Sequence, residues 1–162
     1  MKHHNQQSGF SIIDMIMGLS IIIIGIVGVQ YVQRNYIESA SQVEINLRAI
    51  SLGNSVMNII RMHAYDESTA SPWSLTLGPD LGESSNTDYD DIDDYAGASW
   101  DFSSDGFEGF TVNTQVFYVE VPNNWLDSIG TRSNFKRIVV TVSHQVLNAP
   151  VIFTSLMTGV DR

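Results

Sequence analysis

The sequence contains no cysteine, and this absence removes several kinds of chemistry. Disulfides, thiolate metal sites and cysteine nucleophiles are all excluded for this chain of 162 residues. Basic residues are also scarce: 8 lysines and arginines face 18 aspartates and glutamates, which gives a formal net charge of -10. Binding to nucleic acid requires clustered Lys and Arg opposite the phosphates. We therefore expect no interaction with nucleic acid.

Sequence signatures of catalysis are missing as well. The chain has no G-x-S-x-G motif, no P-loop and no dinucleotide-binding fingerprint. His63 and His144 are far apart and have no partner at a metal-ligand spacing, so ordinary structural roles are expected for both rather than zinc binding. The sequence therefore predicts that the protein is not an enzyme and has no catalytic residues.

A long apolar run lies close to the N-terminus. No charged residue occurs from Met15 to Gln33, and residues 15–29 read MIMGLSIIIIGIVGV. A helix of about 20 such residues crosses the hydrocarbon core of a bilayer. Lys2 precedes the run, and a basic residue on the short side predicts that this end stays in the cytoplasm. The chain after Arg34 is then expected on the outer side of the membrane.

Two ordinary explanations of the run are a secretory signal peptide and a plain membrane anchor. Asp14 stands at the entrance of the run, where a cleavable signal normally has no charge. No A-x-A-like cleavage site follows, since Glu38-Ser39-Ala40 is a poor substitute. A plain anchor leaves the carboxylate of Asp14 without a purpose, and a charge at membrane depth is expensive.

The segment Gly9-Phe10-Ser11-Ile12-Ile13-Asp14-Met15 resembles the processing signal of type IV prepilins. The resemblance implies that a prepilin peptidase cuts between Gly9 and Phe10 and that the new N-terminal Phe10 is methylated. It also implies that Asp14, the fifth residue of the mature chain, pairs with the N-terminal ammonium of a neighbouring subunit in the filament, which offsets the desolvation of both charges. The family usually has Glu at this position, and its major pilins often have a helix-kinking proline that this chain lacks.

Apolar residues continue at helical spacing beyond the run, which predicts one amphipathic helix from about Phe10 to Ala64, roughly 80 Å long. Ser71-Pro72 marks the latest position at which this helix can end. The residues expected on the buried face are Ala40, Val43, Leu47, Ile50, Met57, Ile60 and Ala64, widened by Ile45, Leu52, Val56 and Ile59.

The rest of the chain predicts a loop region followed by strands. Residues 68–109 are rich in Gly, Ser, Asp and Asn, whereas residues 110–121, 135–144 and 150–158 are rich in β-branched and aromatic residues. Short links between consecutive strands favour an antiparallel meander. The expected fold class is α+β, with a long N-terminal helix packed on a small antiparallel sheet, and this arrangement agrees with the type IV pilin fold.

The expected organisation has three parts. Residues 1–9 form the leader, and residues 10–34 form the half of the helix that lies in the membrane or the filament core. Residues 35–162 form a periplasmic domain, with helix to about residue 65, an acidic loop region at 68–109 and antiparallel strands at 110–158.

Segments further along the chain resemble MSHA-type minor pilins, of the MshD kind. They are Asp90-Asp91-Ile92-Asp93-Asp94-Tyr95 with Gly97, then Gly109–Val116 and Lys136–Ser143. The resemblance implies a minor pilin of the bacterial inner membrane, passing through the membrane once, that moves through the periplasm into an extracellular pilus. Its implied partners are other pilin subunits, the prepilin peptidase and the inner-membrane assembly platform. A type II secretion pseudopilin is the nearest alternative, and a tip-displayed adhesin or ligand-binding module is an alternative of another class.

The acidic segment offers hard oxygen ligands for calcium. The candidate ligands are Asp88, Asp90, Asp91, Asp93 and Asp94. Their spacing does not match an EF-hand, so we expect a solvated acidic loop with Ile92 and Tyr95 turned inward, weak or no calcium binding, and no other cofactor.

Lys136 and Arg137 open a predicted strand in an otherwise acidic chain. Two interpretations remain open for this pair. The residues form a solvated strand edge, or they dock onto an acidic loop of a neighbouring subunit, where opposite charges fix the register.

Overall fold

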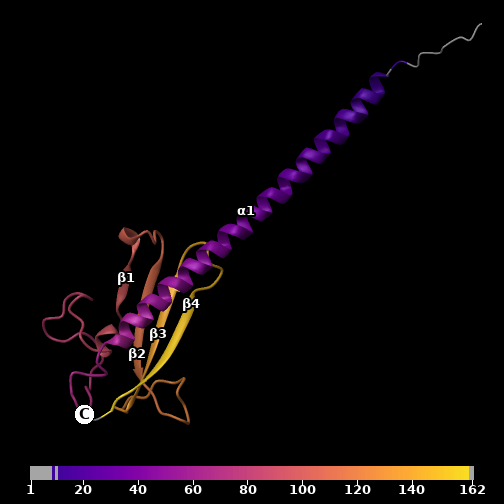
Figure 1. The fold of residues 1–162 in the computed structure, drawn as a ribbon. Helices are drawn as coiled ribbons and strands as arrows, with labels where there is room; N and C mark the ends of the chain where they lie inside the picture. Colours follow the sequence, from indigo (N-terminus) through magenta and orange to yellow (C-terminus); the bar gives the residue numbers. More distant parts are fainter. Residues whose placement is uncertain (1–8, 10, 161–162) are drawn as a thin grey trace, which may run out of the picture. The chain divides into compact units, whose positions relative to one another are not determined.

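The computed structural model describes residue 9 and residues 11–160. The elements follow in the order α1 (Ile12–Met62), η1 (Asp93–Tyr95), β1 (Ser99–Asp101), η2 (Ser103–Asp105), β2 (Thr111–Tyr118), β3 (Phe135–Ser143) and β4 (Val151–Thr158). Figure 1 shows the long helix and the strands along the chain. The predicted α+β class, a long N-terminal helix with a small antiparallel sheet, is confirmed. The chain divides into two compact units at Ser41 and Gln42, which are described separately below.

The first unit contains the N-terminal part of α1, up to Ser41. Every described side chain from Ser11 to Ser41 is exposed, although most residues of the apolar run are large and aliphatic. The helix contains a segment apolar and long enough to cross a membrane, judged by length and composition. A helix that is apolar around its whole circumference is typical of a membrane span or of the interior of a larger assembly.

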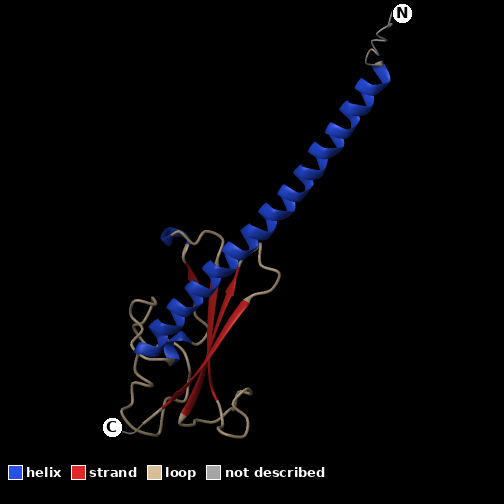
Figure 2. Cartoon of the chain, turned by 45° about the vertical axis from the view of Figure 1, so that its right-hand side comes forward, coloured by secondary structure: helices blue, strands red, loops and turns tan. Residues whose placement is uncertain are grey.

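The second unit is built on a four-stranded antiparallel sheet with the order β1-β2-β3-β4. The C-terminal part of α1 lies against one face of this sheet (Figure 2). Burial alternates along β2 and β3, as expected for strands with one covered face. The three strands expected from the sequence correspond to β2, β3 and β4, whereas β1 is a short addition within the expected loop region.

The helix face that meets the sheet agrees in part with the predicted one, which included Leu52, Val56, Met57 and Ile60. Its buried residues are Ala49, Leu52, Gly53, Val56, Met57 and Ile60. Val43, Leu47 and Ile50 were expected on this face but are exposed by 58%, 62% and 41%. The helix carries apolar residues on more than one side, so the spacing alone identified only part of the side that the sheet covers.

Gly53 allows this close helix–sheet contact. A Cβ atom at this position would overlap the ring of Phe153 on β4. The remaining core comes from the inner faces of β2 and β3 together with Ile92, Tyr95, Trp100 and Phe110. The expectation that Ile92 and Tyr95 point inward is therefore confirmed, with exposures of 0% and 1%.

Candidate functional site

The first candidate site is the start of α1. Gly9 is exposed, whereas Phe10, the predicted methylation site, lies outside the described residues. The Ser11 hydroxyl accepts a hydrogen bond from the Ile13 backbone N–H at 3.3 Å, and the Asp14 carboxylate accepts one from the Ser11 N–H at 3.2 Å. This reciprocal pair resembles a capping box in which the Ser11 hydroxyl accepts from the second helical residue instead of the third, and it satisfies N–H groups that the first helical turn leaves free. Asp14 therefore has a local role in addition to the predicted contact between subunits.

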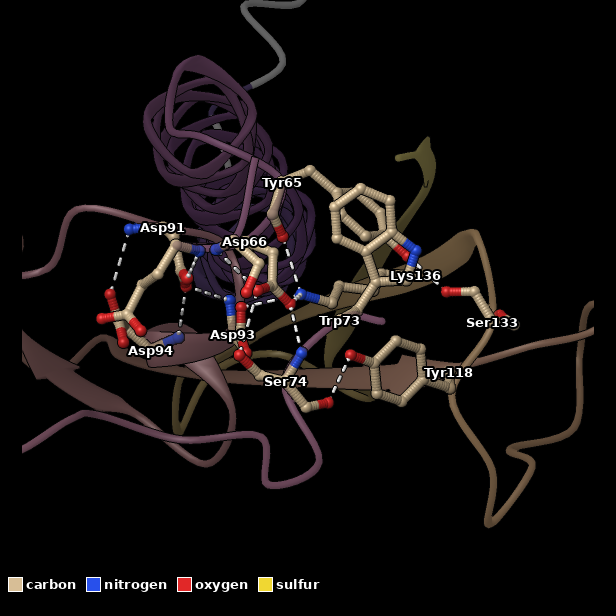
Figure 3. Close-up of polar contacts among 12 residues, drawn as sticks. Tyr65, Asp66, Trp73, Ser74, Asp91, Asp93, Asp94, Tyr118, Ser133 and Lys136 are labelled. Carbon is tan, nitrogen blue, oxygen red and sulfur yellow. Dashed lines mark hydrogen bonds and ion pairs between the residues drawn. The ribbon is translucent and has the colours of Figure 1, made fainter. Parts of the chain in front are cut away.

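The second candidate site surrounds Lys136, at the start of β3. The Lys136 ammonium donates to the Tyr65 carbonyl oxygen at 2.7 Å, to Asp66 Oδ2 at 3.1 Å and to Asp93 Oδ1 at 2.7 Å. Figure 3 shows these groups converging beneath the end of α1. The side chains of Lys136 and Asp66 are 0% exposed and that of Asp93 is 5% exposed. Three buried charged groups thus meet within hydrogen-bond distance.

This position overturns both interpretations of Lys136. It is not on a solvated strand edge and it cannot reach a neighbouring subunit, because it is buried against Asp66 and Asp93 of its own chain. The two-residue period of β3 explains the burial, since Lys136 shares its face with Ile138, Val140 and Val142. Arg137 points to the other face, where it donates to the carbonyl oxygen of Leu126.

Asp66 is held by several groups besides Lys136. Its carboxylate accepts hydrogen bonds from the Ser68 N–H at 3.1 Å, from the Ser74 N–H at 2.8 Å and from the Ser74 hydroxyl at 3.0 Å. Burial by itself raises the pKa of Asp66, but the hydrogen bonds from Ser74 and Ser68 and the Lys136 ammonium outweigh it and hold the pKa below its usual value.

Aromatic rings shield the Lys136 cluster from water. The Lys136 Nζ lies 4.4 Å from the centroid of the Tyr65 ring and 5.4 Å from that of Tyr118. Burial, together with the nearby carboxylates, raises the pKa of both tyrosines, so both stay neutral hydrogen-bond donors. The Tyr65 hydroxyl donates to the Ser133 carbonyl oxygen, and the Tyr118 hydroxyl donates to that of Ser74.

The acidic segment is not the solvated loop expected from the sequence. Asp91, Asp93 and Asp94 are exposed by 2%, 3% and 3%. A backbone hydrogen bond from Ile92 to the Ala64 carbonyl oxygen ties the segment to the end of α1. The apolar side chain of Ile92 lies in the core, and its neighbours Asp91 and Asp93 are therefore buried as well.

Backbone N–H groups compensate the burial of these carboxylates. Asp91 accepts from the N–H groups of Asp93 and Glu67, both at 2.8 Å, and Asp94 accepts from those of Asp90 and Asp91. Burial, followed by the proximity of Asp93 and Asp94, raises the pKa of Asp91 to about 9. These contacts organise the turn that carries Asp93 to Lys136.

The predicted calcium ligands are split among different environments. Two groups of carboxylates lie close enough to share a cation: Glu67 with Asp90 and Asp91, and Glu83 with Asp90 and Asp94. Of the other predicted ligands, Asp88 accepts from the Ser85 N–H and Asp93 binds Lys136. Glu67 and Glu83 were not among the predicted ligands, because Glu67 is distant in the chain from the acidic segment and Glu83 precedes it outside the run of aspartates.

A cavity of about 500 Å³ adjoins the first of these carboxylate groups. It is lined by Tyr65, Glu67, Trp73, Asp90 and Val160, among others. The side chain of Asp80 raises the pKa of Glu67 to about 7, with smaller effects from burial and other acidic groups. The cavity therefore combines aromatic walls with acidic groups, a lining suited to a cationic group rather than to an anion.

The histidines have ordinary structural contacts. His63 Nε2 lies 3.0 Å from the Tyr95 hydroxyl, and the His144 ring lies against Phe110.

Comparison of the chain with protein-family models, with curated proteins and with solved structures gives no match. The described residues form a helix with a long apolar segment and an α+β unit built on a four-stranded sheet. Functional inference therefore depends on the residues of this chain.

Proposed function

We propose that this protein is a minor type IV pilin, similar to those of the MSHA type, that is processed by a prepilin peptidase and incorporated into a pilus filament. The observation that carries the proposal is the helix segment Ile12–Ser41, whose described side chains are all exposed within the chain. Such a surface requires lipid or other helices around it. The segment begins within the Gly9–Met15 signal and continues directly behind it.

The proposal gives the segment two successive environments. Before assembly it spans the inner membrane once, with its N-terminus in the cytoplasm and the acidic domain in the periplasm. After assembly it packs among the helices of other pilin subunits. Val43, Leu47 and Ile50, exposed on the second unit, provide further apolar surface for contacts between subunits. The role is structural, and no catalytic step is assigned to the chain.

The processing step provides the primary test. The full chain is produced in cells with and without a prepilin peptidase, and its N-terminal peptide is identified by mass spectrometry. A chain beginning at methylated Phe10 is expected only with the peptidase. A Gly9→Leu variant serves as the control and is expected to remain uncut. A chain that keeps residue 1 in both strains, or that is cut beyond Val29, contradicts the proposal.

A second measurement separates a pilus from a secretion system. The processed protein should be recovered with sheared surface filaments in cells that assemble a type IV pilus. Recovery only in cells with an active type II secretion system would assign it to the pseudopilins. Binding of a surface ligand by protein located only at filament tips would instead favour the adhesin alternative.

A further inference from the structure

The chain has two lysines, Lys2 and Lys136. Lys136 is fully buried, and its Nζ atom lies 2.7 Å from Asp93 Oδ1 and 3.1 Å from Asp66 Oδ2. This places an amine nucleophile, a carboxyl group and a second carboxylate together in a site that water does not reach. The three groups come from distant parts of the chain, since Asp66 follows α1, Asp93 begins η1 and Lys136 lies in β3.

Such a site favours reactions that neutralise the buried lysine and carboxylate. The desolvation of buried ions often costs more free energy than their mutual attraction provides. The rings of Tyr65 and Tyr118 flank the Lys136 nitrogen and further exclude water. Condensation of the ammonium with a carboxylate gives a neutral amide and releases water, which removes two buried charges at once. Because the fold already holds the two groups together, the reaction avoids the entropy cost of a bimolecular encounter.

We propose that Lys136 and Asp93 become joined by an intramolecular amide bond between Lys136 Nζ and Asp93 Cγ. Asp93 is assigned as the electrophile because it is the nearer carboxylate. Asp66 is less suited to be attacked, because the Ser68 and Ser74 hydrogen bonds stabilise its negative charge. Asp66 acts instead as the proton carrier, a role that its contact with Nζ permits.

The reaction balances without an added reagent. The Lys136 ammonium passes one proton to Asp93 Oδ1, and the neutral amine attacks Cγ of the resulting carboxylic acid while the Asp66 carboxylate takes a second proton from the attacking nitrogen. The new C–N bond forms, and one C–O bond of Asp93 breaks. The departing oxygen leaves as water with two of the three ammonium protons, one of them carried by Asp66. The third proton stays on the amide nitrogen, Asp66 returns to its carboxylate form, and the opposite charges of Lys136 and Asp93 disappear.

Peptide mass spectrometry of the purified full-length chain tests the proposal. Trypsin is expected to leave Lys136 uncut and to yield residues 62–132 joined to residues 133–137, with a mass lower than the sum of the two peptides by one water. In the denatured protein Lys136 should also resist amine-reactive reagents. Free Lys136 in protein that has folded and been stored would overturn the proposal and leave a non-covalent buried ion pair.

Three variants give matched controls. Lys136→Arg keeps the charge but should show no linked peptide. Asp93→Asn should still form the bond but with loss of ammonia in place of water, a mass signature that an ion pair cannot produce. Asp66→Asn should fold, as judged by circular dichroism, yet accumulate unlinked chain. If a folded Asp66→Asn variant links as fast as the unmodified protein, the proton-carrier role is wrong.

This inference does not depend on the proposed function. The linked peptide starts at residue 62, so its detection is the same whether or not the chain is cleaved after Gly9. Loss of the link with normal cleavage at Phe10 would reject only the amide bond. Linkage without cleavage would reject only the pilin assignment.

Discussion

The buried charged residues of this chain form ion pairs between positions that are far apart in the sequence. Lys136 lies 70 positions from Asp66 and 43 from Asp93, yet it contacts both. Breaking such a buried pair by removing one partner typically costs about 3–5 kcal/mol, because the other charge stays buried. A cross-link between Asp93 and Lys136 would add roughly 4 kcal/mol by the loop-entropy estimate used for disulfides, for a loop of about 40 residues. The cluster thereby ties the acidic segment to the sheet.

The first residue-scale prediction concerns pH. Burial and neighbouring carboxylates raise the pKa of Asp91 to about 9, well above the ordinary aspartate value that applies in the unfolded chain. The folded state therefore binds a proton that the unfolded state has already lost, so this contribution to stability is complete at acid pH and disappears as pH rises through about 9. Asp66 acts in the opposite direction, but its lowered pKa confines that effect to acid below the ordinary aspartate value.

The free energy of unfolding is therefore expected to fall as the pH of the experiment is raised from about 5 to about 9. Denaturant titrations of the domain at several pH values measure it. Asp91→Asn should flatten this slope, since it removes the titrating group whatever its effect on absolute stability. A stability that rises over this interval, or an unchanged slope in the variant, would show that Asp91 is ionised in the folded protein.

Asp14 allows its local role to be separated from its proposed role between subunits. Its carboxylate accepts a hydrogen bond from the Ser11 N–H within the first helical turn. Asp14→Asn retains an oxygen acceptor but no charge, whereas Asp14→Glu retains both and completes the usual capping box. If the charge pairs with a neighbour's ammonium, the Asp14→Asn variant should be lost from sheared filaments while the Asp14→Glu variant is retained. Equal incorporation of Asn and Glu would mean that only the cap matters.

At the scale of elements, the contact between α1 and β4 depends on one small residue. A side chain at Gly53 would overlap the ring of Phe153. Gly53→Ala gains helix propensity of about 1 kcal/mol, but overpacking of a filled contact costs about 1–3 kcal/mol. We expect a net loss of stability in chemical denaturation of the domain. Phe153→Leu in the same chain should restore part of it, and a stabilised single variant would show that the ring moves aside without cost.

The elements also show what the sequence could and could not predict. The strands were predictable because residues such as Val112, Val116 and Val140 follow the two-residue period of a half-buried sheet. The burial of Lys136 followed from the same period, but its charge obscured the signal. The buried side of α1 was predictable only in part: Leu52 is buried as expected, but Leu47, on a different side of the helix, is exposed. The grouping of Glu67 with Asp90 depends on tertiary contacts between distant loops, which no local pattern contains.

At the scale of the whole molecule, the two units meet different physical requirements. Among the residues that the structure describes, the buried core residues all belong to the second unit, beginning with Ala49 and extending into β3. The first unit contributes none of them, because its described side chains are exposed. A stable domain needs its core and not its anchor. The helix remains continuous through both units because no proline interrupts Ile12–Met62.

This division predicts how truncation affects folding. A fragment of residues 35–162 should be soluble and folded, because it keeps every residue that α1 buries against the sheet and loses the apolar run that requires lipid or other helices. A fragment beginning at Asn54 provides the control, since it also lacks Ala49, Leu52 and Gly53 of the buried face. Removing one buried leucine side chain alone typically costs about 2–5 kcal/mol, a large part of the 5–15 kcal/mol that stabilises a domain. The shorter fragment should therefore give a broad, non-cooperative thermal transition, and the longer one a sharp transition in circular dichroism. If both fragments unfolded with equal cooperativity, the helix would not be part of the core, and if neither folded, the segment before residue 35 would be required for the domain itself.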